Sequence, residues 1–175
     1  MTAASKKSTV KVLVPVLLLA LVFGVWYVKN AQSDKIPTGG VNPDFALAVT
    51  EEFDLEHLKS YGLPIMLDFG SDDCAPCQAM APVLEELNLE LQGKAIIKFI
   101  DVWKYEELGQ DYPLTLIPTQ VFIDAEGKPY TPSNPKAMEM TLFTHRETNE
   151  HLFTTHVGPM TKEEILAALA EMGMK

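Results

Sequence analysis

The chain has very little arginine and very little cysteine, and both shortages limit what it can do. Arg146 is the only arginine among 175 residues. A phosphate or carboxylate clamp built from several arginines is therefore excluded, because only arginine offers a planar fork of donors. Cys74 and Cys77 are the only cysteines, so a scaffold held by several disulfides is excluded too. A disulfide between them closes so short a loop that it adds little stability, and any value must be chemical.

Internal repeats and basic charge are also missing from most of the chain. No period of 20–50 residues recurs, which excludes a solenoid. Residues 1–30 contain four lysines and no acid, whereas residues 31–175 carry 10 basic against 24 acidic groups, a formal net charge of −14. An acidic domain of this kind repels phosphate backbones, so we expect no nucleic acid as partner.

One long apolar run lies near the N-terminus and predicts a membrane anchor. Residues 12–28 contain no charge, and a helix of that length covers about 26 Å of a hydrocarbon core about 30 Å thick. The flanking lysines predict a cytoplasmic N-terminus (1–11) and an extracytoplasmic domain. A cleaved signal peptide is the alternative, but no Ala-x-Ala site follows the run. Residues 29–43 read as a linker and 44–175 as one domain.

The pattern of the domain predicts strands that alternate with helices. We expect strands at 45–49, 65–69, 95–100, 119–123 and 152–157. We expect helices at 54–60, from the cysteines to residue 91, at 103–110 and from 161 to about 172. This order indicates the α/β class, with a mixed sheet flanked by helices.

Cys74 and Cys77 lie in a Cys-Ala-Pro-Cys turn between a predicted buried strand and a predicted helix. A thiolate at a helix N-terminus is stabilised by free N–H groups and the helix dipole, which lowers its pKa. The first cysteine can then attack a disulfide, and the second can resolve the mixed disulfide. Half of a zinc site is the alternative, but no second cysteine pair accompanies it.

The segments LDFGSDDCAPCQAMAPVLEEL, DVW, YPLTLIPTQVFIDAEGK and HVGPMTKEEILAAL resemble the thioredoxin superfamily. The likeness covers about residues 61–130 and 151–172, and it is greatest to membrane-anchored bacterial thioredoxin-like oxidoreductases. It implies the thioredoxin fold, a central mixed β-sheet flanked by helices. It also implies a redox-active disulfide as the working group, with no separate cofactor and no metal.

The resemblance implies a role for each matching residue. Cys74 matches the nucleophile and Cys77 the resolving thiol. Asp68 matches a buried acid that accepts a proton from the resolving cysteine. The sequence supports Asp68 independently, because a carboxylate in an apolar strand has a raised pKa and can transfer protons near neutrality. A purely structural, hydrogen-bonded Asp68 is the alternative.

Pro118 matches the family's cis-proline, which lies against the cysteine pair and helps to dock an extended substrate. We expect its neighbours Ile117 and Thr119 to share in substrate binding. An ordinary trans proline at the start of a strand is the alternative, since few X–Pro bonds are cis.

The chain departs from the family beside the cysteines, where Asp73 replaces the usual tryptophan and Asp72 precedes it. Two carboxylates disfavour a thiolate on Cys74, which predicts a reductant rather than a strong oxidant. We expect these acids, with Ala75 and Pro76 between the cysteines, to tune the redox potential. The alternative is that both acids are screened by solvent.

Residues 131–150 form a predicted insertion in the C-terminal hairpin, with alternation around Leu142, Thr144 and Arg146 and a turn at Thr148–Asn149. Proteins of similar organisation commonly pair with a transmembrane electron carrier of the CcdA/DsbD type, which the resemblance suggests as a partner. Simple loop decoration is the alternative. Three histidines near this region (His145, His151 and His156) raise a metal site as a further possibility.

The leading hypothesis is an extracytoplasmic thiol–disulfide oxidoreductase at the bacterial membrane, acting as a dithiol reductant or relay on protein disulfides. Three alternatives stay open: a disulfide oxidase or isomerase with the same site, a copper-carrying metallochaperone that uses Cys74, Cys77 and a histidine, and an adaptor without turnover.

Overall fold

The computed structural model of the protein describes residues 42–50 and 53–175. The predicted cytoplasmic segment 1–11, the anchor 12–28 and nearly all of the linker 29–43 lie outside the described residues and stay predictions. Within the described ranges, no helix combines the length and the apolar character that crossing a membrane requires.

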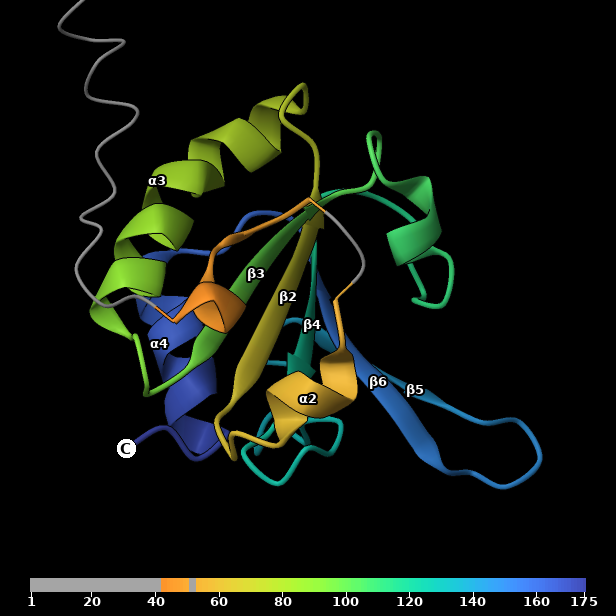
Figure 1. The fold of residues 1–175 in the computed structure, drawn as a ribbon. Coiled ribbons are helices and arrows are strands. Elements are labelled where there is room, and N and C mark those ends of the chain that lie inside the picture. Colours follow the sequence, from red (N-terminus) through yellow and green to blue (C-terminus); the bar gives the residue numbers. More distant parts are fainter. Residues whose placement is uncertain (1–41, 51–52) are drawn as a thin grey trace, which may run out of the picture. The chain divides into compact units, whose positions relative to one another are not determined.

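The centre of the domain is a six-stranded mixed sheet in the order β1-β3-β2-β4-β6-β5. β1, β3 and β2 run parallel, and β4, β6 and β5 continue the sheet with antiparallel pairs. The strands are β1 (Ala48–Val49), β2 (Ile65–Gly70), β3 (Ile96–Asp101), β4 (Thr119–Ile123), β5 (Met140–Thr144) and β6 (His151–Val157). β2 lies between β3 and β4, so the strand that leads into the cysteine turn is enclosed on both sides (Figure 1).

Helices cover both faces of this sheet and confirm the expected α/β class. They are α2 (Leu55–Lys59), α3 (Ala75–Glu90) and α4 (Lys162–Glu171), with short 3-10 helices η1 (Pro43–Phe45) and η2 (Glu106–Gly109). Figure 1 shows α3 and α4 side by side on one face, with α2 on the other. Lys162 of α4 pairs with Glu86 and Glu90 of α3, which ties the two helices together. A capping box of Thr161 and Glu164 begins α4, where the sequence predicted a helix from residue 161.

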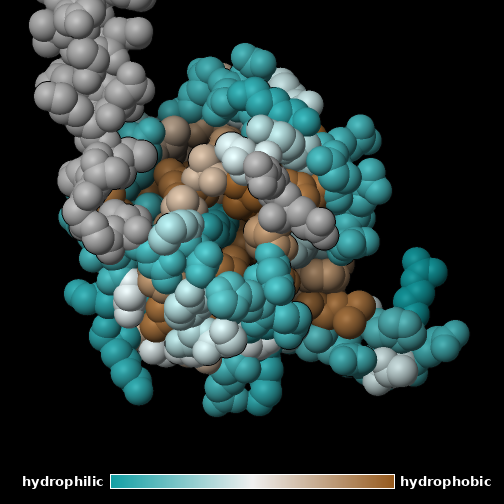
Figure 2. Space-filling view, in the orientation of Figure 1, coloured by the Kyte–Doolittle hydropathy of each residue, from teal (hydrophilic) through white to brown (hydrophobic). Residues whose placement is uncertain are grey.

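Alternation along β2 divides the core into two clusters. Ile65, Leu67 and Phe69 face the α2 side together with apolar residues of β3 and β4. Met66 faces α3 and α4, where it packs against Met80, Leu84 and Leu87 among others. Since strand neighbours alternate, Asp68 and Gly70 also belong to the α3 side. Figure 2 shows the α2 side, where polar residues surround apolar ones exposed over the sheet.

Two predicted elements differ from the structure. The strand expected at 45–49 is a 3-10 helix followed by a two-residue strand, because Pro43 and the Asn42 cap favour a tight turn. The helix expected at 103–110 shrinks to η2. Asp101 explains the second difference, since its carboxylate accepts the N–H groups of Trp103 and Lys104 and holds residues 102–105 in a turn.

The hairpin predicted near residues 142–149 is present as β5 and β6. Leu142 and Thr144 lie in β5, as expected, whereas Arg146 lies in the connection, where Asn149 has a φ of 56°. β5 forms the outer edge of the sheet, and Figure 1 shows the hairpin extending away from the rest of the domain. Whether residues 131–150 are an insertion relative to the family stays a prediction.

Candidate functional site

Cys74 and Cys77 form a disulfide at the first turn of α3. Cys74 is the N-cap residue, and its Sγ accepts the backbone N–H of Cys77 at 3.4 Å. A sulfur at this position takes the place of a capping oxygen and faces the positive end of a 16-residue helix. Cys74 is 7% exposed and Cys77 is 3% exposed. The geometry therefore favours a thiolate on Cys74 once the disulfide is reduced.

The two residues between the cysteines belong to the helix itself. Ala75 and Pro76 are the first two residues of α3, and both are exposed. Pro76 causes no loss there, because N–H groups in the first helical turn have no partner within the helix. Their predicted influence on the redox potential stays a prediction.

Gly70 is a residue of the site that the sequence reasoning did not single out. It ends β2 directly beneath the cysteines. A Cβ placed on it would lie 2.8 Å from Cε2 of Phe99 and 3.2 Å from Sγ of Cys77. Only a residue without a side chain permits this close approach of α3 to the sheet. A glycine just before the cysteine turn was the available signal.

Asp68 lies two residues before Gly70 on the same face of β2, and it is 1% exposed. Its Oδ1 accepts a hydrogen bond from Nε2 of Gln120 at 2.7 Å, while Oδ2 has no partner among the described residues. Burial raises the pKa of Asp68 to about 7, and the bond from Gln120 opposes part of that rise. The raised pKa expected from the sequence is therefore present, and Oδ2 is free to carry the proton.

Pro118 and its neighbours form a loop that lies beside the cysteine pair. The Ile117–Pro118 peptide bond is cis, as expected. The carbonyl oxygen of Ile117 lies 3.9 Å from Sγ of Cys74, so this loop meets the more exposed cysteine. Thr119 is fully buried, and its hydroxyl donates to the carbonyl of Leu116. Thr119 thus shapes the loop, whereas Ile117 is partly exposed beside the sulfur.

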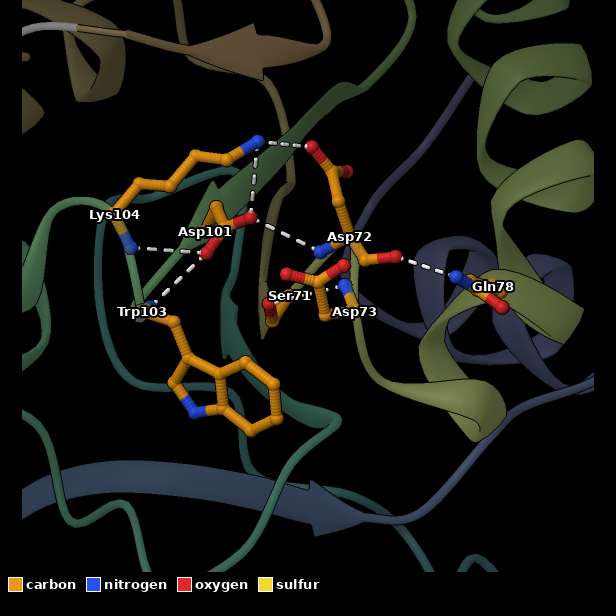
Figure 3. A network of polar contacts seen from close by, with 7 residues as sticks. All are labelled: Ser71, Asp72, Asp73, Gln78, Asp101, Trp103 and Lys104. Atoms are coloured by element: carbon orange, nitrogen blue, oxygen red, sulfur yellow. Dashed lines mark hydrogen bonds and ion pairs between the residues drawn. The ribbon is translucent and has the colours of Figure 1, made fainter.

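The two acids before Cys74 have different surroundings (Figure 3). Asp72 forms an ion pair with Lys104, which also lies 3.6 Å from the buried carboxylate of Asp101. Hydrogen bonds from three backbone N–H groups, together with Lys104, keep the pKa of Asp101 low despite its burial. Asp73 has no ion-pair partner in the part of the chain that the structure describes. The expected repulsion of a Cys74 thiolate therefore rests mainly on Asp73, because Lys104 balances Asp72.

Asp101 also organises the loop that carries these acids. Its Oδ2 accepts the backbone N–H of Asp72 at 3.0 Å, which connects the end of β3 to the cysteine turn. Gln78 of α3 donates to the carbonyl of Asp72 at 2.6 Å from the other side. The loop before Cys74 is thus held from both β3 and α3 (Figure 3). Sequence reasoning did not identify Asp101 or Lys104, since the contact spans about thirty residues.

The histidines considered for a metal site have separate partners. His151 contacts Thr154, and His156 contacts Gln120 in the core. Across residues 42–50 and 53–175, no three His, Cys, Asp or Glu side chains are close enough to hold a metal ion. The copper-carrier alternative therefore receives no geometric support from the described residues.

Known sequences that resemble this chain include thioredoxins. The sequence profile of the family described as thioredoxin matches residues 45–144. Thioredoxin C-2 of Corynebacterium nephridii is 44% identical over 64 residues, which cover 36% of this chain and 59% of that protein, so this match spans less than two thirds of the relative. The thioredoxin of Rickettsia bellii (strain RML369-C) is 32% identical over 79 residues, which cover 45% of this chain and 74% of that protein.

Solved structures show the same fold. A mutant thioredoxin of Halobacterium salinarum NRC-1 matches with a TM-score of 0.53 at 23% identity, covering 78% of this chain and 98% of the other. A poplar wild-type thioredoxin h matches with a TM-score of 0.51 at 16% identity, covering 74% and 97%. The expected arrangement of a mixed sheet between helices is confirmed.

We expect Gly70→Ala to disrupt the site and to destabilise the fold by about 1–3 kcal/mol, as overpacking does. The new methyl group must displace Phe99 or Cys77. Urea unfolding and the alkylation rate of the reduced cysteines measure the two effects. Gly93→Ala is the control: it strains a positive φ but meets nothing within 4 Å, so only stability should fall. Unchanged alkylation in Gly70→Ala would contradict the close packing.

We expect Asp68→Asn to make the disulfide form more stable at pH 8, by about 1 kcal/mol or more. The folded pKa of about 7 exceeds that of an unfolded aspartate, about 3.9. The folded state therefore holds the extra proton between these values, and wild-type stability falls as pH rises through that window. Urea unfolding at pH 5 and pH 8 measures the difference, with exposed Asp73→Asn as control. An equal effect at both pH values would refute the buried titration.

Proposed function

Because the chain belongs to the thioredoxin family and is a thiol–disulfide oxidoreductase, we propose that it works as a dithiol reductant or relay on protein disulfides. One observation carries the proposal. Cys74 caps α3 beside the cis-proline loop, and the buried Asp68 lies on the same face of β2 as Gly70, which adjoins Cys77. In this proposal Cys74 is the nucleophile, the loop before β4 docks the substrate and Asp68 of β2 accepts the proton.

The first step uses the thiolate of reduced Cys74. It attacks one sulfur of a substrate disulfide, so that a mixed disulfide forms and the other substrate sulfur leaves as a thiolate. Cys74 suits this role because it is the more exposed of the two cysteines and its sulfur accepts the N–H of Cys77. The same hydrogen bond stabilises the negative charge before the attack.

The second step releases the substrate. The thiol of Cys77 gives its proton to Asp68, and the resulting thiolate attacks Sγ of Cys74. The bond between Cys74 and the substrate breaks, and its electron pair leaves with the substrate sulfur. The enzyme then holds a disulfide and the substrate holds two reduced sulfurs. Asp68 can accept a proton near neutral pH because its pKa is about 7.

Apolar side chains near the cysteines offer a docking surface for an unfolded segment. Trp103 is 63% exposed, Leu116 is 68% exposed and Val157 is 45% exposed. Trp103 follows Asp101, which holds the cysteine loop, and Leu116 precedes the cis-proline loop. Val157 pairs with Thr119 at the adjacent strand end. We infer that substrates present apolar residues next to their disulfide.

Electrostatics support the reducing direction. A negative charge next to Cys74 destabilises its thiolate and with it the reduced state, whereas strong oxidants have a stabilised reduced state. Asp73 supplies that charge, while Asp72 is balanced by Lys104. The effect is modest, because both acids are exposed.

The proposal also includes a cellular location and a source of electrons. The uncharged run 12–28, flanked by lysines, supports a single-pass anchor in a bacterial membrane with the catalytic domain outside the cytoplasm. A tethered reductant outside the cytoplasm needs a membrane donor of electrons. A transmembrane thiol carrier of the CcdA/DsbD type, suggested by resemblance, has the required chemistry.

With dithiothreitol as the electron donor, we expect the wild type to catalyse the reduction of insulin disulfides and Cys74→Ser to lose this activity. Cys77→Ser should instead accumulate a mixed disulfide, because the attacking sulfur remains but the resolving one is gone. Turbidity and non-reducing electrophoresis measure the two outcomes. His145→Ala, in the hairpin connection, is the control and should keep full activity. Wild-type turnover by Cys74→Ser would exclude Cys74 as nucleophile.

We expect the potential of the cysteine pair to lie near the thioredoxin value of about −270 mV rather than the value of about −120 mV of strong oxidants. Replacing both acids (Asp72→Asn with Asp73→Asn) should make the potential less negative by about 10–20 mV, because exposed charges act weakly. Equilibration with glutathione or dithiothreitol measures both quantities. Glu163→Gln on α4 is the charge control. A wild-type potential near the oxidising value would overturn the proposed direction.

A further inference from the structure

A row of polar side chains crosses the α3 side of the sheet, in the middle of an apolar core. Asp68 of β2 pairs with Gln120 of β4, and Gln120 pairs with His156 of β6. The same row continues to Phe99 of β3 on one side and to Met140 of β5 on the other. The three polar residues are 1%, 0% and 7% exposed in that order. Burying polar groups costs free energy unless they form hydrogen bonds, so three buried polar side chains in one row need an explanation.

The three side chains form a continuous chain of hydrogen bonds. Nε2 of Gln120 donates to Oδ1 of Asp68 at 2.7 Å, and Oε1 of Gln120 lies 2.9 Å from Nδ1 of His156. Both polar atoms of the amide are thereby used. Because an amide oxygen can only accept, the proton between Gln120 and His156 must belong to Nδ1 of the histidine.

The row lies close to the part of α3 that follows the cysteine turn. Nε2 of Gln120 also lies 3.6 Å from Sδ of Met80, one turn after Cys77 in α3. Asp68 precedes Gly70 by two residues on the same face, and Gly70 touches Cys77. The amide of Gln120 thus engages Oδ1 of Asp68 and leaves Oδ2 without a partner, on the face of β2 where Gly70 adjoins Cys77.

We propose that His156 and Gln120 are positioning residues for proton transfer: His156, with its proton on Nδ1, orients the Gln120 amide, which holds Oδ1 of Asp68 and leaves Oδ2 to take the proton of Cys77. This assignment rests on the proposed function, since it concerns the step that frees the Cys77 thiolate. It adds two residues to the site, and neither touches the substrate or a sulfur that reacts.

The charge environment of the row is simple. Asp68 lies beside Phe99 of β3 and Gln120 of β4 in the sheet. Met80 of α3 adjoins Gln120, and Cys77 adjoins Gly70 on the same face of β2, so of these neighbours only reduced Cys77 titrates. Burial lowers the pKa of His156, while Glu164 of α4, Glu139 before β5 and the backbone of Gly158 oppose that shift. A neutral His156 can still donate from Nδ1, so the orienting bond persists at pH 7.

The amide of Gln120 acts on Asp68 by favouring its charged form. A donor to a buried carboxylate lowers the carboxyl pKa, against the effect of burial. Without that donor, Asp68 would hold its proton to higher pH and would accept a proton from Cys77 less readily at neutral pH. A freely rotating Gln120 could present its oxygen to Asp68 instead, with a similar consequence.

The test follows the carboxyl pKa of Asp68 by ¹³C NMR of the full chain, in its disulfide form, with Asp68→Asn to assign the signal. We expect Gln120→Met, which keeps the length but has no donor, to raise that pKa by about one to two pH units. The acid limb of the pH profile for insulin reduction should move to higher pH by a similar amount, because Asp68 must lose its proton before it can accept one.

A matched pair at His156 separates orientation from packing. His156→Leu frees the amide and should raise the Asp68 pKa by about half a unit to one unit. His156→Asn places an amide nitrogen where Nδ1 was, and it should keep the wild-type pKa. In the wild type, ¹⁵N NMR should show a proton on Nδ1 of His156 and none on Nε2 at pH 8.

Three results would overturn the inference: an unchanged Asp68 pKa in Gln120→Met, equal shifts in both His156 variants, or the opposite tautomer of His156. If Gln120→Met does not fold, the pair at His156 and the tautomer decide the matter. Failure of the proposed function is recognised separately. In that case the wild type would not reduce insulin disulfides, while the carboxyl titration could still follow the amide.

Discussion

The packing of the first turn of α3 on the end of β2 is the contact on which the rest of the site depends. Gly70 has no side chain, so Cys77 can lie against the backbone of the central strand. That approach places the helix N-terminus, and with it Cys74, at the end of the central strand β2, beside the cis-proline loop. The close position of the helix end, and with it the electrostatic benefit to Cys74, therefore depends on the absence of a side chain at Gly70.

The same approach explains why a carboxylate is buried beneath the cysteines. Asp68 lies on the face that α3 covers, so bringing the helix close also removes the acid from water. Desolvation then raises its pKa into the range in which thiols exchange protons. The stability of the folded protein is lower at neutral pH as a result, because an ionised carboxylate in this position is poorly solvated. The fold therefore carries a local cost in stability at Asp68, the residue proposed to accept the proton of Cys77.

The sequence predicted the parts of the site that depend on local pattern. The helix that begins at the cysteines, the strand that contains Asp68 and the last helix from residue 161 are short-range features, and the structure contains each of them. The cis bond before Pro118 was expected only through resemblance, since sequence alone favours trans. The helix expected at 103–110 is shorter in the structure because the side chain of the nearby Asp101 competes for the backbone N–H groups of Trp103 and Lys104.

What the sequence could not show is the set of contacts made across strands. Lys104 reaches Asp72 over 32 positions, and Gln120 reaches Asp68 over 52. Neither spacing has a periodic signature, because register between strands joined by long connections is decided by the whole sheet. Yet these contacts affect the two carboxylates directly: Lys104 balances the charge of Asp72 at the surface, and Gln120 stabilises the charged form of Asp68 in the core. The outer contact is open to solvent and screened by salt, whereas the inner one is buried, so the inner contact acts more strongly on its carboxylate.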